Sequence, residues 1–169
     1  MKIAVISDTH IADSSKAAPD AMWEMVELAD CVVHLGDFTS EEFADELEKR
    51  SRLYAVHGNA DSYALKSRYP ATLIMELEGV KAALVHQFAG PWSAATGRAE
   101  NYRRAGVSLI LFGHTHKPED TTIAGVRLVN PGSAGDGRQT KGVLTAGMLT
   151  VAGGRLSWEL WPLGREVMV

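Results

Sequence analysis

The chain has 169 residues, of which 46% are hydrophobic and 22% charged, and its formal net charge is -4. This length and composition fit one domain, residues 1–169, with a continuous core, and exclude a disordered or fibrous chain. No apolar run approaches membrane-spanning length, and the charge gives no reason to expect tight binding to bulk nucleic acid, so we expect a cytoplasmic protein without membrane contact.

The first third of the chain alternates short apolar runs with segments of helical periodicity. The helix at 41–50 has Ser40 as a plausible N-cap, acidic residues in its first turn, and Lys49 and Arg50 in its last turn. Alternation of strands with helices predicts a mainly parallel sheet. We expect strands at 2–7, 31–35 and 53–57, and helices at 18–28 and 41–50.

The remainder of the chain is richer in strands. Two apolar runs flank Glu78-Gly79, which predicts a hairpin over Thr72–Leu77 and Val80–Val85. We further expect a helix at 99–105, strands at 108–112, 121–123, 126–129, 142–151 and 155–160, and a turn at 152–154. Two packed sheets with flanking helices account for this order.

Metal-capable side chains follow five separate strands of this prediction. In sheets of this kind ligands bind beyond the carboxyl ends of strands, so we expect these side chains to converge in space. They are Asp8 and His10 after the first strand, Asp37 after the second, Asn59 after the third, His86 after the hairpin, and His114 and His116 after the strand at 108–112.

Aspartate, histidine and an asparagine amide suit manganese first, with iron, zinc or nickel as alternatives. Thiolates do not contribute, because Cys31 is the single cysteine and its apolar neighbours predict a buried strand thiol. Seven donors with one of them shared can hold two divalent ions about 3.5–4 Å apart. Asp37 is the natural bridge, because each of its carboxylate oxygens can bind one ion.

Each of these positions also has an ordinary structural interpretation. Asp8 could cap a turn, and Asn59 between Gly58 and Ala60 could be a turn residue in the left-handed conformation. His34 and His57 are most simply interpreted as core or surface histidines. None of these interpretations explains why all five strand ends carry a metal-capable side chain.

The ordered motifs resemble the signature of the calcineurin-like metallophosphoesterases, and the chain length and Asn130-Pro131-Gly132-Ser133 resemble the small bacterial and archaeal phosphodiesterase branch. That branch also contains the retromer subunit. The resemblance implies an α/β fold, a four-layer α/β/β/α sandwich of two mixed sheets flanked by helices. The motifs are Asp8-Thr9-His10, Gly36-Asp37, Gly58-Asn59-Ala60-Asp61, His86 and Gly113-His114-Thr115-His116.

Carried over by position, the resemblance implies two metal sites and a set of catalytic residues. Asp61 is expected to orient its neighbours rather than bind an ion, with a solvated loop carboxylate as the alternative. The first ion would be held by Asp8, His10, Asp37 and His116, the second by Asp37, Asn59, His86 and His114, and the catalytic residues would be His10, Asp37, Asn59 and Asp61.

We therefore expect a binuclear phosphodiesterase that hydrolyses a small-molecule phosphodiester with activated hydroxide. Two positions depart from the pattern of many relatives. Ala60 replaces a histidine that helps to protonate the leaving group, which leaves water or His57 as proton donor, and Gln87 replaces a glycine and would narrow the pocket mouth.

Other functions stay open from the sequence. A nuclease on short nucleic acid or a phosphomonoesterase would use the same chemistry, and a non-catalytic binding scaffold would use the same fold. The segment 88–104, with Trp92, Arg98, Arg103 and Arg104, could contact substrate. The apolar C-terminus, 160–163 with Met168 and Val169, is consistent with a homo-oligomer or with core packing.

Overall fold

The computed structural model describes residues 1–11, 17–88 and 92–165, and the Trp92 side chain, Met168 and Val169 lie outside the described part. In chain order the elements are β1 (Lys2–Ile6), α1 (Asp20–Glu27), β2 (Cys31–His34), α2 (Glu41–Arg50), β3 (Leu53–Ala55), α3 (Tyr63–Arg68), β4 (Thr72–Leu77), β5 (Val80–Val85), α4 (Trp92–Arg104), β6 (Leu109–Leu111), β7 (Pro118–Ile123), β8 (Val126–Pro131), the 3-10 helix η1 (Arg138–Thr140), β9 (Val143–Ala152) and β10 (Arg155–Arg165).

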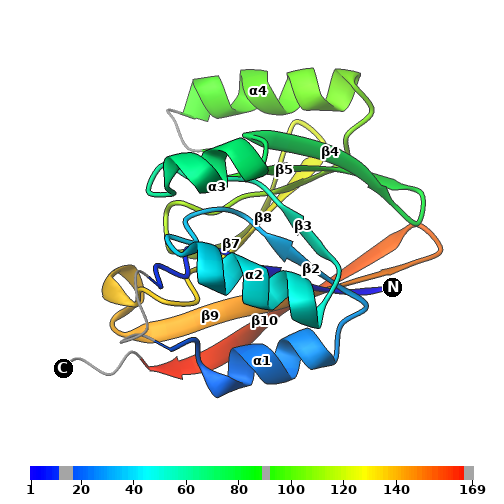
Figure 1. Ribbon diagram of the computed structural model, residues 1–169. Coiled ribbons are helices and arrows are strands. Elements are labelled where there is room, and N and C mark those ends of the chain that lie inside the picture. The colour runs from blue at the N-terminus through cyan, green and yellow to red at the C-terminus, as the bar shows by residue number, and fades with distance from the viewer. Residues whose placement is uncertain (12–16, 89–91, 166–169) are drawn as a thin grey trace.

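Two five-stranded mixed sheets form the centre of the molecule. One sheet has the order β10-β9-β1-β2-β3, in which β1, β2 and β3 run parallel. The other has the order β4-β5-β6-β8-β7, in which β5, β6 and β8 run parallel. Helices α1 and α2 lie on the outer side of the first sheet and α4 on the outer side of the second (Figure 1), which confirms the expected four-layer α/β/β/α sandwich.

Side chains of β1 alternate between two layers of the core. Ile3 and Val5 pack between the two sheets, whereas Ala4 and Ile6 pack against α1 and α2. All four are fully buried, because a parallel strand in a sandwich is covered on both faces. Cys31 is also buried between the sheets as a free thiol, as its sequence context predicted.

Helix α2 has the caps that its sequence predicted. The Ser40 hydroxyl accepts a hydrogen bond from the Phe43 amide, and Lys49 and Arg50 lie in the last turn. Helix α3, which we did not predict, is only six residues long, and its Ser62 hydroxyl accepts from the Leu65 amide. One buried residue, Leu65, gives too weak a periodicity to identify a helix from the sequence.

The largest error in the predicted elements concerns α4, which begins at Trp92 rather than at residue 99. Gly97 lies inside this helix, where glycine costs about 1 kcal/mol relative to alanine. Ala95 and Ala99 on either side of it pack against the second sheet, and this burial offsets the cost. Strands β7 and β10 are likewise longer than predicted, beginning at Pro118 and ending at Arg165.

The carboxyl ends of the parallel strands of both sheets meet at one edge of the sandwich. Several hydrogen bonds join the sheets there, including two from the residues that follow β5 and β6. The His86 ring, which follows β5, bonds through Nδ1 to the Leu35 carbonyl oxygen, which follows β2, at 2.8 Å. The His114 amide, which follows β6, donates to Asp8 Oδ2, which follows β1, at 2.9 Å. This edge therefore brings together loops that are far apart in sequence.

Candidate functional site

Two groups of ionisable side chains at this edge place their donor atoms close enough for a metal ion. Within each group, one donor atom of every residue lies within 4.8 Å of the others. The first group is Asp8, His10 and His116, and the second is Asp8, Asp37 and His86. The convergence expected from the strand ends is therefore present for these five residues.

Asp8 is fully buried and its two carboxylate oxygens have different surroundings. Oδ2 accepts hydrogen bonds from the Ser7 hydroxyl at 2.6 Å and from the His114 amide at 2.9 Å. Oδ1 accepts no hydrogen bond from the described residues and lies 3.3 Å from His116 Nε2. A buried anionic oxygen without a donor is costly, and a bound cation would satisfy it.

Asp37 is oriented in a similar way. Its Oδ1 accepts from the Ala60 amide at 2.8 Å, while Oδ2 lies 3.4 Å from His86 Nε2 and 3.8 Å from His10 Nε2. Burial raises the pKa of Asp37, but His86 and the Ala60 amide outweigh it, so the pKa lies below its usual value. Asp37 is therefore a carboxylate, with one oxygen directed between two histidines.

His10 and His116 come from different strand ends and face each other. Their Nε2 atoms are 3.2 Å apart, and their ring centroids 5.0 Å. Burial lowers the pKa of His10, and the neighbouring Asp8 carboxylate raises the pKa of His116. At this distance one imidazole can donate its N–H to the lone pair of the other, and a cation bound between the two rings would instead take both lone pairs.

His86, Asn59 and His114 form the other side of the site. His86 Nε2 lies 3.1 Å from Asn59 Oδ1, and the rings of His86 and His114 have centroids 5.1 Å apart. Burial lowers the pKa of His86, but Asp37 outweighs it, so the pKa lies above its usual value. All seven sequence-predicted donors thus lie at this edge. His114 is placed there by the contact of its ring with His86 and by the hydrogen bond from its amide to Asp8.

Asp61 is buried and binds three backbone amides rather than facing the donor groups. Oδ2 accepts from the amides of Gly58 and Asp37, at 2.7 and 3.0 Å, and Oδ1 accepts from the Thr39 amide at 2.9 Å. It therefore ties the loop after β3 to the loop after β2. The alternative of a solvated loop carboxylate is wrong, because Asp61 is only 4% exposed.

Glycines allow the loops of the site to approach closely. A Cβ at Gly58 would lie 2.0 Å from Asp37 Oδ1, and a Cβ at Gly113 would lie 2.8 Å from Asp8 Oδ2. Only a residue without a side chain fits in either position. These contacts give a physical reason for the Gly58-Asn59 and Gly113-His114 pairs in the sequence.

Several of the donor residues have an unfavourable backbone conformation. Their φ angles are positive, which costs residues other than glycine about 1–2 kcal/mol each. The structure does not support the interpretation of Asn59 as a left-handed turn residue, because Asn59 is absent from the positive-φ residues in the described part of the chain. The positive-φ residues include Asp8 (φ 54), His10 (φ 47), Asp37 (φ 58), His114 (φ 70) and His116 (φ 57). Backbone strain of this kind concentrates at functional sites.

The sequence analysis did not identify most of the residues that support the donors. Ser133 lies in a motif quoted above, and its hydroxyl donates to the Asp8 carbonyl at 2.7 Å. Asn130 of the same motif donates to the Gly113 carbonyl at 2.9 Å. No sequence motif pointed to Asp136, yet its Oδ2 lies 3.4 Å from His116 Nδ1. Asp136 also forms an ion pair with Arg138, which lowers the pKa of Asp136 to about 2.

His34 is a core histidine, as its simplest interpretation predicted, but it also contacts the site. The Gly36 amide donates to its Nδ1 at 3.2 Å, so Nε2 carries the proton and donates to Thr9 Oγ1, also at 3.2 Å. Its ring stacks on Phe38 with centroids 3.5 Å apart. Burial holds the pKa of His34 well below its usual value, so the ring is neutral.

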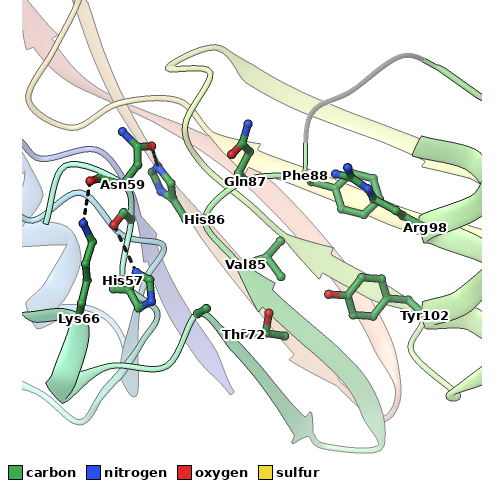
Figure 2. Close-up of a pocket in the computed structure, with 12 residues that line it drawn as sticks. His57, Asn59, Lys66, Thr72, Val85, His86, Gln87, Phe88, Arg98 and Tyr102 are labelled. Carbon is green, nitrogen blue, oxygen red and sulfur yellow. Dashed lines mark hydrogen bonds between the residues drawn. The ribbon is translucent and has the colours of Figure 1, made fainter. Parts of the chain in front are cut away.

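A cavity of about 430 Å³ adjoins the donors on the side of Asn59 and His86. Figure 2 shows His57, Asn59 and Lys66 on one side of it, Arg98 and Tyr102 on the other. His57 bonds through Nδ1 to the Gly58 carbonyl at 3.2 Å. Gln87 also lines the cavity, next to His86, as its sequence position suggested, and so does Arg98 of the segment 88–104.

Comparison with known proteins identifies the family. Residues 1–154 match the sequence model of the calcineurin-like phosphoesterase superfamily domain. A probable metallophosphoesterase of Methanothermobacter thermautotrophicus is 33% identical over 138 residues, which are 79% of this chain and 77% of the relative. Among the residues described, no helix has the length and apolar character to cross a membrane.

Solved structures agree with this result. The solution NMR structure of a Thermotoga maritima protein aligns with a TM-score of 0.74 and 33% identity, over 95% of this chain and 98% of that one. A structure described as a novel archaeal phosphodiesterase shares the fold, with a TM-score of 0.69 and 22% identity over 95% and 99% of the two chains. The sequence model, the archaeal relative and the fold agree, and the chain belongs to the calcineurin-like phosphoesterase superfamily.

Proposed function

We propose that this protein is a metal-dependent phosphodiesterase that hydrolyses a small phosphodiester and acts in the cytoplasm. The observation that supports this proposal most directly is that donors from four strand ends, those of β1, β2, β5 and β6, meet around the buried Asp8 carboxylate, whose Oδ1 accepts no hydrogen bond. Carboxylate, imidazole and amide donors suit two divalent transition-metal ions, manganese first. Family membership supports hydrolase chemistry on a phosphoester.

The donor positions divide between two ions. Asp8, His10 and His116 would hold the first ion, and the distances of 3.3 Å and 4.0 Å from Asp8 Oδ1 to the Nε2 atoms of His116 and His10 support this assignment. Asp37 would contribute to both ions, since its Oδ2 lies 3.8 Å from His10 Nε2 and 3.4 Å from His86 Nε2. The second ion would be held by Asp37, Asn59, His86 and His114.

Once bound, the cations would supply Lewis-acid activation of a water nucleophile and of the phosphoryl oxygens. The chain itself orients the reacting groups. Asp61 holds the loops that carry Asp37 and Asn59, and Asp136 contacts the far nitrogen of His116. Ala60 offers no proton donor, so His57, which lines the adjoining cavity, or solvent protonates the leaving oxygen.

The test measures hydrolysis of bis(4-nitrophenyl) phosphate by protein loaded with manganese. We expect turnover that a chelator abolishes and that added manganese restores. Asp37→Ala should reduce turnover to the uncatalysed rate while its circular dichroism spectrum matches that of the wild type. Undiminished turnover by metal-free Asp37→Ala protein would end the proposal.

The same assay separates the alternatives. A nuclease would be inhibited steadily by oligonucleotides and would prefer them as substrates, whereas a phosphomonoesterase would hydrolyse 4-nitrophenyl phosphate faster than the diester. A binding scaffold would take up the ions without turnover on any ester. The net charge of -4 gives no electrostatic support for a groove that binds extended nucleic acid.

A further inference from the structure

The cavity beside Asn59 and His86 differs in charge from the rest of the protein. Lys66 and Arg98 line it, and none of the described residues that line it is acidic. The chain as a whole carries four more acidic than basic residues, so this is a local cationic surface on an anionic protein. A cavity of this kind favours an anionic ligand.

The floor of the same cavity is apolar and aromatic. Val85 and Phe88 are almost fully buried beneath it, and the half-buried Tyr102 lies beside Phe88 with ring centroids 6.4 Å apart. In Figure 2 Val85 lies between the Lys66 side of the cavity and Tyr102, which belongs to the same helix as Arg98. A flat aromatic ring would bury apolar area there without displacing the cationic side chains of Lys66 and Arg98.

Polar groups that both donate and accept hydrogen bonds surround this floor. They are the Gln87 amide, the Thr72 hydroxyl and the Tyr102 hydroxyl, all of which line the cavity. Such groups match the edge of a heterocycle, which carries donors and acceptors, better than the edge of a hydrocarbon ring. The volume of about 430 Å³ accommodates one mononucleotide-sized group, not an extended strand.

We propose that this cavity binds a nucleoside phosphate arm of the substrate, with the base against Val85, Phe88 and Tyr102. A phosphate beyond the scissile one would lie near Arg98, across the cavity from Lys66, whose ammonium group donates to the Asn59 carbonyl at 2.9 Å. The inference rests on the proposed function for its place in the reaction, because Asn59 and His86 belong to both the cavity and the donor set. A small phosphodiester with a phosphorylated nucleoside arm is thus the substrate class.

Binding is tested first, without turnover. Calorimetric titration of metal-free protein in chelator should show that adenosine 5′-monophosphate binds at least about tenfold more tightly than adenosine. A Lys66→Gln/Arg98→Gln variant should lose this difference, and Arg104→Gln, on the same helix outside the cavity, should retain it. Equal affinity for the two ligands in the wild type, or a difference that the double variant retains, would overturn the inference.

Turnover is tested second, with manganese-loaded protein and two dinucleotides, one with and one without a 5′-terminal phosphate. The phosphorylated dinucleotide should have a kcat/KM at least about tenfold higher, and the double variant should reduce that ratio toward one. Tight binding of the monophosphate without hydrolysis of any diester would contradict the proposed function alone. Hydrolysis of both dinucleotides at equal rates would contradict the nucleoside phosphate pocket alone.

Discussion

His86 Nδ1 lies 2.8 Å from the carbonyl oxygen of Leu35 and thereby joins the two sheets at the site. A carbonyl oxygen only accepts, so Nδ1 carries a proton in either charge state, and in the neutral ring Nε2 is the nitrogen with a lone pair facing Asp37 and Asn59. One contact between the sheets therefore sets both the orientation and the tautomer of a proposed ligand. Other contacts act on the donors in the same indirect way.

Gly58→Ala should disturb Asp37 directly. The added Cβ would lie 2.0 Å from Asp37 Oδ1, so the carboxylate must move. We expect a manganese affinity lower by about 10–100-fold and a stability lower by about 1–3 kcal/mol. Calorimetric metal titration and urea unfolding measure the two effects.

Gly97→Ala is the matched control for that change. A Cβ at Gly97 meets no atom within 4 Å, and the residue lies inside α4. We expect unchanged metal affinity and a gain of about 0.5–1 kcal/mol in stability, because alanine favours the helix. Equal metal affinity of both variants would refute the role assigned to the close approach at Gly58.

Asp61→Asn should loosen the loops after β2 and β3. The carboxylate accepts from three backbone amides, and an asparagine side chain replaces one of its acceptor oxygens by a donor. We expect a loss of about 1–3 kcal/mol in the free energy of unfolding, with faster hydrogen exchange at the amides of Asp37 and Gly58. The exposed Glu159→Gln serves as control and should unfold like the wild type.

Asp136→Asn tests whether the contact with His116 Nδ1 orients that ring. We expect a metal affinity lower by about 10–100-fold, because an amide fixes the imidazole less firmly than a carboxylate. Asp120→Asn is the control, since Asp120 also pairs with an arginine, Arg127, but does so on strands β7 and β8 away from the donors. If both substitutions left metal uptake unchanged, Asp136 would have no positioning role.

Buried His34 makes a testable contribution to the pH dependence of stability. Its pKa is held well below 6.5 in the folded protein, so below pH 6.5 the unfolded chain binds a proton that the folded chain does not. That difference reduces stability as pH falls, by up to about 1.4 kcal/mol per pH unit. Urea unfolding between pH 6.5 and 5 should show that the stability of the wild type relative to His34→Gln declines on acidification. Parallel curves for the two proteins would contradict this account.

Much of the site was predictable from the sequence because its donors follow strands. Asp8, Asp37, Asn59 and His86 each come directly or within a few residues after a buried apolar run, and parallel strands present such ends at one edge. Local signals of this kind survive in the sequence, since strand periodicity and short polar motifs depend only on neighbours in the chain. The two-sheet architecture followed from the same signals.

The supporting contacts and the cavity depended on tertiary structure alone. Asp136 lies beside His116, 20 positions away in the chain, and no periodicity or motif links the two. Helix α3 and the first half of α4, which supply Lys66 and Arg98 to the cavity, have weak local signals and are stabilised by packing on the sheets. The sequence by itself determined which side chains are available for chemistry. How the two sheets pack determined which of them meet, because that packing depends on contacts between distant residues.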